Sequence, residues 1–302
     1  MTHDWSGCGT ALVTPFTAGG AVDEPAVRRL AARQIAAGVD FLVPCGSTGE
    51  SPTLSRTEQL RVVEWVVDTA AGRVPVLAGA GGYNTRDVID LVADMRRAGA
   101  DGILSVTPYY NRPSPEGIYQ HYRAIAESTP LPIVVYNVPG RTGCNVDVGT
   151  LCRLADISNI VGVKEASADM AQMCEICRAV PTGFSVLAGD DLFALPLLAV
   201  GGAGVISVVS NETPEEMSRL VSVALNGDYD TARQLHTRLL PLMQVNFIET
   251  NPIPVKAAMA HLGLLEPHYR LPMVPPRPDS LTRIVQVLDS LGISSLPAAA
   301  SD

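Results

Sequence analysis

The sequence predicts a (β/α)8 TIM barrel of the α/β class with a helical extension at its carboxyl end. Short apolar runs ending in Gly, Pro, Ser or Thr alternate about eight times with stretches of helical periodicity. The apolar runs are continuous, which is typical of parallel strands buried on both faces. Eight such units fit into residues 1–225, a length that suits a closed barrel, and residues 226–302 form the predicted helical region.

The predicted strands begin near the amino terminus and continue to position 209. Each contains branched or aromatic apolar residues and stops where residues that favour turns appear. In a closed barrel the carboxyl ends of the strands meet at one mouth, where active sites are built. The predicted strands are 9–16, 40–46, 74–81, 102–108, 131–138, 160–165, 184–189 and 204–209.

The helices between these strands carry capping residues at their ends. Ser55 stands three residues before Glu58, which is the spacing of a capping box. Local chemistry and apolar periodicity therefore agree on where the helices begin and end. Predicted helices include 24–37, 55–71, 85–98 and 115–127, with Asn84 and Ser114 as further N-caps and with Gly38, Gly72 and Gly99 after helix ends.

An open, doubly wound sheet is the alternative fold for alternating strands and helices. Such a sheet normally uses fewer strands and carries a Gly-rich dinucleotide-binding turn after the first one. The first turn here reads Thr14-Pro15-Phe16-Thr17, which lacks that fingerprint. The closed barrel is therefore the favoured fold.

After position 226 only helical patterns remain, at 228–249, 255–262 and 281–291. The prolines at 272, 275, 276 and 278 predict a stiff connector before the last helix. Residues 294–302 are expected to form a loose tail.

The composition is that of an ordinary globular protein and excludes several functions. Acidic residues outnumber basic ones by 31 to 22, and without a Lys/Arg run no nucleic-acid partner is expected. The start of the chain lacks a basic segment followed by an apolar one, so we expect a cytoplasmic protein. Segment 192–209 is uncharged but is interrupted by Pro196, Gly201, Gly202 and Gly204, which favours a buried helix and strand over a membrane span.

The six cysteines do not form a disulfide framework in a chain of this length. Cys174 and Cys177 make one C-x-x-C pair, the spacing of redox and zinc sites. No second pair follows, and both cysteines share helical spacing with Met170 and Met173. We therefore expect both to be buried, small apolar side chains.

Lys164, near the end of the sixth predicted strand, is the residue that points most directly to chemistry. Because side chains alternate along a strand, Ile160, Gly162 and Lys164 are expected on one face, toward the barrel interior or its mouth. A buried ammonium is either ion-paired or shifted toward its neutral form, which is a nucleophile. Imine formation at neutral pH requires that the lysine pKa be lowered by roughly 2–3 units. The alternative is a structural ion pair with Glu165 or Glu50.

Hydroxyl groups at other strand ends favour the nucleophile over the ion pair. Imine formation and carbon–carbon bond making require protons to be moved at specific atoms, a task that suits tyrosine. Tyr136 ends the strand next to that of Lys164, and we expect Ser47 and Tyr110 to supply two further hydroxyls from the same mouth. Each tyrosine alone would be interpreted as a core residue. Together with Lys164, these residues predict a Schiff-base aldolase that acts on pyruvate or another 2-keto acid.

Other barrel chemistries fit the sequence less well. A metal-dependent aldolase needs histidines with carboxylates, whereas all five histidines fall outside the strand ends, so no metal is expected. Sites for phosphorylated substrates place Gly-rich turns after strands seven and eight, but the glycines at 201, 202 and 204 stand before or at the start of the last strand. The glycines of 79–82 are interpreted as a tight turn.

Five segments carry a more specific signal. They are Gly46-Ser47-Thr48-Gly49-Glu50-Ser51, Tyr136-Asn137-Val138-Pro139, Val163-Lys164-Glu165, Gly204-Val205-Ile206-Ser207 and Asn251-Pro252-Ile253-Pro254-Val255-Lys256. In these segments the chain resembles the class I aldolase family that contains dihydrodipicolinate synthase and N-acetylneuraminate lyase. The likeness covers nearly the whole chain, because the segments are spread over the barrel and the C-terminal helices.

Two further features resemble the synthase branch of this family. The segment Tyr109-Tyr110-Asn111-Arg112-Pro113 is similar to one whose second tyrosine reaches into the site of a neighbouring subunit. Arg141 is similar to the arginine that binds the carboxylate of aspartate semialdehyde. The resemblance implies condensation of pyruvate with L-aspartate 4-semialdehyde in lysine and diaminopimelate biosynthesis. It also implies a homotetramer, built as a dimer of dimers, that requires no cofactor.

The resemblance implies a role for each site residue. Lys164 forms the imine with pyruvate, and Tyr136 relays protons with Ser47 and Tyr110. The implied substrate-binding residues are Thr48 and the backbone of Ile206 for the pyruvate carboxylate, Arg141 for the second carboxylate, and Gly189 at the end of the seventh strand.

Two places depart from the synthase pattern. Serine stands at position 47, where synthases usually have threonine, so a lyase for a 2-keto-3-deoxy sugar acid or N-acetylneuraminate is an alternative, opposed by Arg141. A keto-acid-binding barrel without catalysis is a further alternative, opposed by the presence of both Lys164 and Tyr136. Gln59 and Asp87 stand where lysine-inhibited members have histidine and glutamate, which predicts weak or absent inhibition by lysine.

Overall fold

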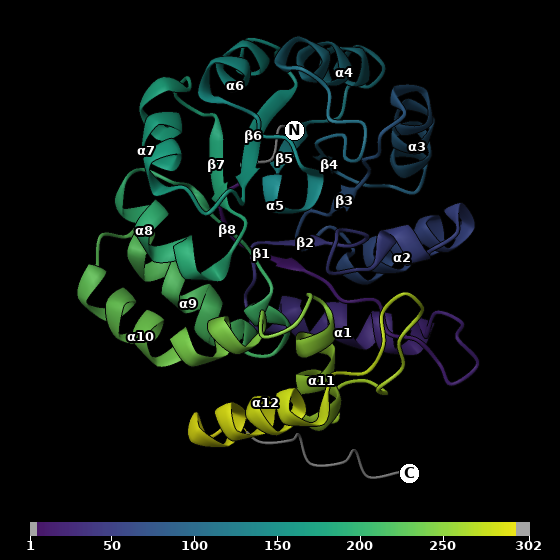
Figure 1. The fold of residues 1–302 in the computed structure, drawn as a ribbon, viewed down its shortest axis with the longest axis vertical. Helices are drawn as coiled ribbons and strands as arrows, with labels where there is room; N and C mark the ends of the chain where they lie inside the picture. Colours follow the sequence, from purple (N-terminus) through teal and green to yellow (C-terminus); the bar gives the residue numbers. More distant parts are fainter. Residues whose placement is uncertain (1–4, 294–302) are drawn as a thin grey trace.

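The computed structural model describes residues 5–293, and these form the predicted barrel (Figure 1). Eight parallel strands are joined in the order β2-β1-β8-β7-β6-β5-β4-β3. A parallel bridge between Leu42 and Val76 connects β2 to β3 and closes the ring. The strands are β1 Gly7–Ala11, β2 Phe41–Val43, β3 Leu77–Gly79, β4 Gly102–Val106, β5 Ile133–Asn137, β6 Ile160–Glu165, β7 Ser185–Ala188 and β8 Gly204–Ser207.

Most strands are shorter than the sequence predicts, chiefly at their carboxyl ends. The apolar pattern predicts that the second strand reaches position 46, but β2 ends at Val43 because Pro44 follows and Cys45 takes a positive φ of 57°. Buried apolar residues also continue past the strand ends, as at Leu12 and Val13, so the apolar pattern does not mark where a strand stops. β6 matches its predicted range at both ends.

The prediction that Ile160 shares a face with Lys164 is wrong. Ile160 pairs with Ile133, but the ladder resumes only at Gly162, so β6 contains one extra residue, Val161. This β-bulge shifts the alternation of side chains by one position. Ile160 therefore packs in the outer core, whereas Val161 packs against the inner one.

The barrel has an apolar core inside the ring of strands and a larger one between the strands and the helices. Trp5, just before β1, fills the amino end of the barrel and lies edge-on to Phe41, with ring centroids 5.5 Å apart. Gly102 makes room for it, because a Cβ at that position would lie 2.5 Å from the Trp5 ring. The amino end of the barrel is thereby filled, and the opposite end is left for a site.

The helix ends follow the predicted capping chemistry. Ser55 and Glu58 form the complete capping box at the start of α2, and the side chains of Asn84 and Ser114 cap the helices that follow them. Gly38, Gly72 and Gly99 take positive φ after helix ends. The helices of the barrel are α1 Glu24–Ala36, α2 Arg56–Ala70, α3 Thr85–Arg97, α4 Pro115–Glu127, α5 Pro139–Thr142, α6 Val148–Ala155, α7 Met170–Ala179, α8 Ala194–Ala199 and α9 Pro214–Leu225, with 3-10 turns η1 Ser51–Thr53, η2 Asp191–Phe193 and η3 Val209–Asn211.

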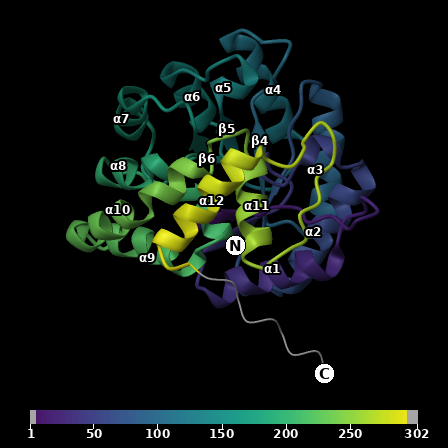
Figure 2. The same ribbon diagram turned by 60° about the horizontal axis from the view of Figure 1, so that its bottom comes forward.

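Three more helices form the C-terminal part: α10 Tyr229–Val245, α11 Ile253–His261 and α12 Pro278–Ser290. The connector between α11 and α12 runs back toward α2 in both views (Figures 1 and 2). Arg270 anchors this connector by donating hydrogen bonds to the carbonyls of Gly20 and Thr53. Pro278 belongs to the first turn of α12 and not to the connector, and the predicted tail 294–302 lies outside the described residues.

Segment 192–209 and the C-x-x-C pair lie within the barrel. Within residues 5–293, no helix is long and apolar enough to cross a membrane, and segment 192–209 contains α8 and β8. The prediction that both cysteines of the C-x-x-C pair are buried is wrong. Met173 and Ile176 form the inward face of α7, so Cys174 falls on the outward face and is exposed, and Cys177 is half-buried.

Candidate active site

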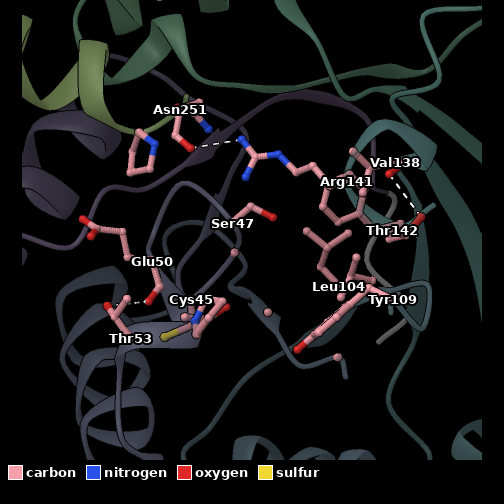
Figure 3. Close-up of a pocket in the computed structure, with 18 of the residues that line it drawn as sticks. Cys45, Ser47, Glu50, Thr53, Leu104, Tyr109, Val138, Arg141, Thr142 and Asn251 are labelled. Atoms are coloured by element: carbon pink, nitrogen blue, oxygen red, sulfur yellow. Dashed lines mark hydrogen bonds between the residues drawn. The ribbon is translucent and has the colours of Figure 1, made fainter. Parts of the chain in front are cut away.

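A cavity of about 260 Å³ opens at the carboxyl ends of the strands (Figure 3). Its wall comes from the segments that follow β2, β3, β4 and β5, and from positions 251, 252, 272 and 273 of the C-terminal part. Of the predicted site residues, Ser47, Tyr136 and Arg141 line this cavity directly. The C-terminal part therefore completes the wall of a site that the barrel alone leaves open.

Lys164 and Tyr136 are paired across the ladder between β6 and β5. Lys164 is 5% exposed and Tyr136 is 6% exposed, and the Lys164 Nζ lies 4.5 Å from the centroid of the Tyr136 ring. The two strand ends thus bring the Lys164 amine against the Tyr136 ring; Tyr136 lines the cavity, whereas Lys164 lies behind it and is not among the lining residues. This is the arrangement that imine chemistry with proton transfer requires.

The predicted ion-pair alternative for Lys164 is wrong. Glu50 pairs instead with Lys256, with 2.7 Å between Oε1 and Nζ. Glu165 accepts a hydrogen bond of 2.9 Å from Asn137 Nδ2. Lys164 forms no ion pair with any carboxylate in the described part of the chain, so its amine is not held as a structural cation.

The residues that follow Tyr136 and Lys164 hold the two strand ends in register. The Asn137 side chain donates to Glu165 and accepts a hydrogen bond of 3.0 Å from the amide of Val146. Asn137 and Glu165 are both fully buried. Because buried hydrogen bonds of this kind are costly to break, they fix the position of the amine relative to the phenol.

The β2 loop, residues 44–51, presents two hydroxyl groups. Cys45 and Glu50 take positive φ values of 57° and 53°, and these turns fold the loop across the barrel mouth. Ser47 lines the cavity, and Thr48 is buried, with its Oγ1 accepting a hydrogen bond of 2.9 Å from Asn251 Nδ2. The loop therefore has one hydroxyl that faces the cavity and one that is held by the C-terminal part.

Arg141 lies in α5, directly after β5, and its guanidinium reaches across the cavity toward Asn251 (Figure 3). Arg141 Nη2 donates a hydrogen bond of 3.0 Å to the carbonyl of Asn251. Arg141 is otherwise exposed, so the rest of its planar set of donors is available to a carboxylate entering the site. Asn251 contacts both Thr48 and Arg141 and so connects the two predicted carboxylate-binding groups.

Gly189 and Ile206 are not among the residues that line the cavity. Gly189 follows β7, and its amide donates to the Glu165 carbonyl at 2.7 Å. A Cβ on Gly189 would lie 2.6 Å from the Ala166 Cβ, so glycine lets the ends of β6 and β7 approach closely. Ile206 on β8 is fully buried in the inner core. Their roles toward a substrate stay predictions.

The prediction that Tyr110 supplies a hydroxyl to the mouth of its own barrel is wrong. Tyr110 is 90% exposed and does not line the cavity, whereas the neighbouring Tyr109 does. Tyr109 is held by an edge-to-face contact with Tyr83, with ring centroids 5.4 Å apart. Tyr110 takes a positive φ of 69°, which points the two consecutive tyrosines in different directions.

Asn251 and Lys256 are functional candidates to which sequence reasoning assigned no role. In the sequence, the segment from Asn251 to Lys256 carries only a family resemblance. Its two polar residues each contact the β2 loop, Asn251 at Thr48 and Lys256 at Glu50. A lysine among apolar residues at the start of a helix was the available signal, because a charge in such a position needs a partner.

Gln59 and Asp87 line a second cavity, of about 240 Å³, beside the first. The Gln59 amide donates to the Ser51 carbonyl at 2.9 Å, and Asp87 accepts a hydrogen bond of 2.9 Å from Asn84. Both side chains are therefore engaged within the chain.

Comparisons with known proteins show the family to which the chain belongs. Residues 4–291 match the model of a family described as the dihydrodipicolinate synthetase family. The chain is 50% identical over 288 residues to the 4-hydroxy-tetrahydrodipicolinate synthase of Koribacter versatilis, covering 95% of this chain and 96% of that one. It superimposes on the dihydrodipicolinate synthase of Aquifex aeolicus with a TM-score of 0.95 and 41% identity, covering 97% of this chain and 100% of that one. The enzyme of Acinetobacter baumannii, solved in complex with pyruvate, gives a TM-score of 0.94 and 40% identity, with 95% and 99% covered.

Proposed function

Because the chain belongs to the dihydrodipicolinate synthetase family, we propose that it is a class I aldolase that condenses pyruvate with L-aspartate 4-semialdehyde to give 4-hydroxy-tetrahydrodipicolinate, a step of lysine and diaminopimelate biosynthesis. The observation that carries the proposal is the pairing of Lys164 with Tyr136, which lines the cavity. No other buried amine in the described residues lies beside a phenol that lines this cavity.

In the first stage Lys164 attacks the carbonyl carbon of pyruvate. The carbinolamine that forms loses water to give the imine, and Tyr136 moves the protons, with Ser47 as the neighbouring hydroxyl. Thr48 and the backbone of Ile206 bind the pyruvate carboxylate. The cationic imine then acts as an electron sink, so that loss of a methyl proton gives the enamine.

In the second stage the enamine carbon attacks the aldehyde carbon of the semialdehyde. A carbon–carbon bond forms, and the aldehyde oxygen takes a proton to become the hydroxyl group. The amino group of the second substrate then attacks the imine carbon, closes the ring and displaces the Lys164 amine. All atoms and electrons of the product come from the two substrates.

Arg141 supports the assignment of the second substrate. Its guanidinium lines the cavity, 3.0 Å from the Asn251 carbonyl, and leaves donors free for a carboxylate. A neutral sugar chain makes no use of such a cation. Together with the synthase names of the relatives, this favours the synthase over the sugar-acid lyase that serine at position 47 suggested.

We further propose that the enzyme works in the cytoplasm as a homotetramer and that Tyr110 completes the proton relay of a neighbouring subunit. The 90% exposure of Tyr110 supports this role, because a large aromatic side chain gains little from facing water. Gly189 is proposed to line the substrate path through its backbone, since it lies beside Glu165 at the end of β6.

The proposal is tested by mixing the purified protein with both substrates and following the product in a coupled reductase assay. Steady turnover is expected, together with a borohydride-trapped pyruvate adduct on Lys164 in the mass spectrum. If the condensation assay shows no turnover but the protein releases pyruvate from a 2-keto-3-deoxy sugar acid, the protein is the lyase instead. Absence of any adduct would favour a barrel that only binds.

A further inference from the structure

Lys256 is a second buried lysine, and the reaction proposed above does not use it. It lies in α11, is fully buried, and pairs with Glu50 of the β2 loop, with 2.7 Å between Nζ and Oε1. The two residues stand 206 positions apart in the sequence. The pair therefore joins the C-terminal part to the loop that carries the Ser47 and Thr48 hydroxyls.

The pair lies among aromatic rings, is incompletely hydrogen-bonded, and has one further charge close by, the guanidinium of Arg270, whose Cζ lies 4.4 Å from the centroid of the Phe16 ring. The Lys256 Nζ lies 4.3 Å from the centroid of the Phe16 ring and 5.1 Å from that of Tyr269. The second carboxylate oxygen of Glu50 is buried and has no hydrogen-bond partner among the described residues. Removing two charges from water into such a place is costly, and a well-packed apolar pair is often as stable or more stable. Stability alone does not account for this ion pair.

The position of Glu50 in the loop indicates what the pair does. Glu50 takes a positive φ of 53°, and its amide donates to the Ser47 carbonyl at 3.1 Å, which closes a turn around Thr48. Pulling the Glu50 side chain toward α11 therefore sets the orientation of this turn. Asn251, from the same C-terminal segment, holds the turn at a second point through the Thr48 hydroxyl.

We propose that Lys256 is a positioning residue that, through its ion pair with Glu50, holds the β2 loop so that Ser47 faces the keto acid bound in the cavity and Thr48 keeps its contact with Asn251. The inference rests on the proposed function for the identity of that ligand. Lys256 is not a second nucleophile, because it is fully buried and its amine is held in the ion pair with Glu50, whereas Lys164 has no such partner among the described residues. It acts through Glu50 and not on the substrate.

The test replaces both charges by unbranched apolar side chains in the double variant Glu50→Met, Lys256→Met. The variant is expected to fold, with a melting temperature close to that of the parent, because the apolar pair removes two buried charges. The KM for pyruvate is expected to rise about 10- to 100-fold, as for the loss of one charged hydrogen bond, while kcat changes less. The variant Asn251→Ala removes the second contact, keeps the ion pair, and is expected to raise the same KM.

Hydrogen exchange gives a readout that does not depend on activity. Amides in the β2 loop are expected to exchange faster in the double variant, whereas those in β5 and β6 do not change. An unchanged exchange rate in the loop, or an unchanged KM for pyruvate, overturns the proposal. If the double variant does not fold, the variant Glu50→Gln is used in its place. Its KM for pyruvate and the exchange rate of its β2-loop amides then decide whether the ion pair positions the loop. A parent protein that forms no pyruvate adduct on Lys164 refutes the proposed function, while the exchange experiment still decides the positioning role.

Discussion

The amine of Lys164 lies 4.5 Å from the centroid of the Tyr136 ring, so the predicted nucleophile and the predicted proton relay contact each other across adjacent strands. The contact uses the face of the ring and not the phenol hydroxyl, and Tyr136 is one of the residues that line the cavity. Removing that hydroxyl should therefore change chemistry without changing packing.

In the variant Tyr136→Phe, kcat is expected to fall by about 10²- to 10⁴-fold, the usual contribution of a positioned acid or base. The melting temperature should change little, because phenylalanine fills the same space. Steady-state kinetics and rates of borohydride trapping measure the loss. A kcat within a factor of about three of the parent value would exclude Tyr136 from the proton relay.

Two substitutions at Ser47 test separately the role of its hydroxyl group and the effect of the methyl group that a threonine would add. Ser47→Ala removes the hydroxyl and is expected to lower kcat by at least about tenfold. Ser47→Thr keeps the hydroxyl and restricts χ1, so its kcat should equal or exceed the parent value. If both variants lose activity equally, the site requires serine for its size, and the hydroxyl is not part of the relay.

Arg141→Ala is expected to raise the KM for aspartate semialdehyde by about 10- to 100-fold, because a charged hydrogen bond contributes roughly 1.5–3 kcal/mol. The KM for pyruvate should stay near the parent value. Arg141→Lys is the matched control, since it keeps the charge but loses the planar, bidentate geometry, and an intermediate KM is expected. Equal effects on both substrates would contradict a role specific to the second carboxylate.

Lysine is expected to inhibit the enzyme weakly or not at all. Gln59 and Asp87 replace the histidine and glutamate of lysine-inhibited members, and their side chains already bond to Ser51 and Asn84. Both side chains line the second cavity with their polar groups already engaged within the chain. Initial rates measured over a lysine series test this, and a steep loss of activity at sub-millimolar lysine would show that the cavity binds it.

His121 is expected to make stability fall as the pH drops below neutrality. It is 5% exposed, and burial lowers its pKa to about 4. Between its ordinary pKa of about 6.5 and that value, the unfolded chain binds a proton that the folded chain does not, so protonation favours unfolding across this window. Once His121 is fully protonated in the unfolded state, near pH 4, the free energy of unfolding is lower by up to about 3 kcal/mol.

Urea unfolding at pH 7.0 and pH 4.5 measures this dependence, with His121→Gln as the comparison. The parent is expected to lose more stability than the variant between the two pH values. Other buried acids, such as Asp191, contribute equally to both proteins and cancel in the difference. Identical losses in parent and variant would show that His121 is protonated in the folded state.

Most of the fold and the central pair of the site could be predicted, because they depend on local pattern. The alternation of apolar runs with capped helices gave eight parallel strands, and consecutive parallel strands place Tyr136 beside Lys164. Ser47 and Arg141 follow strand ends and therefore reach the same mouth.

The errors lie where orientation depends on distant parts of the chain. The bulge at Val161 is a property of the ladder with β5 and leaves no trace in a run of apolar residues. Which of Tyr109 and Tyr110 faces the cavity is decided in a loop, where side chains follow no period. The contact between Lys256 and Glu50 joins two segments that only the folded chain brings together.

The connector anchored by Arg270 supplies the last residues of the cavity wall to be synthesised. Chains leave the ribosome amino end first, so all eight strands and Lys164 emerge before Met273, which closes the wall of the cavity. A nascent chain that stops before Arg270 has every strand of the barrel and the amine of Lys164, but it lacks the part of the cavity wall formed by residues 272 and 273. The wall of the cavity is therefore completed by residues that are synthesised more than 100 positions after Lys164, although every strand of the barrel precedes them.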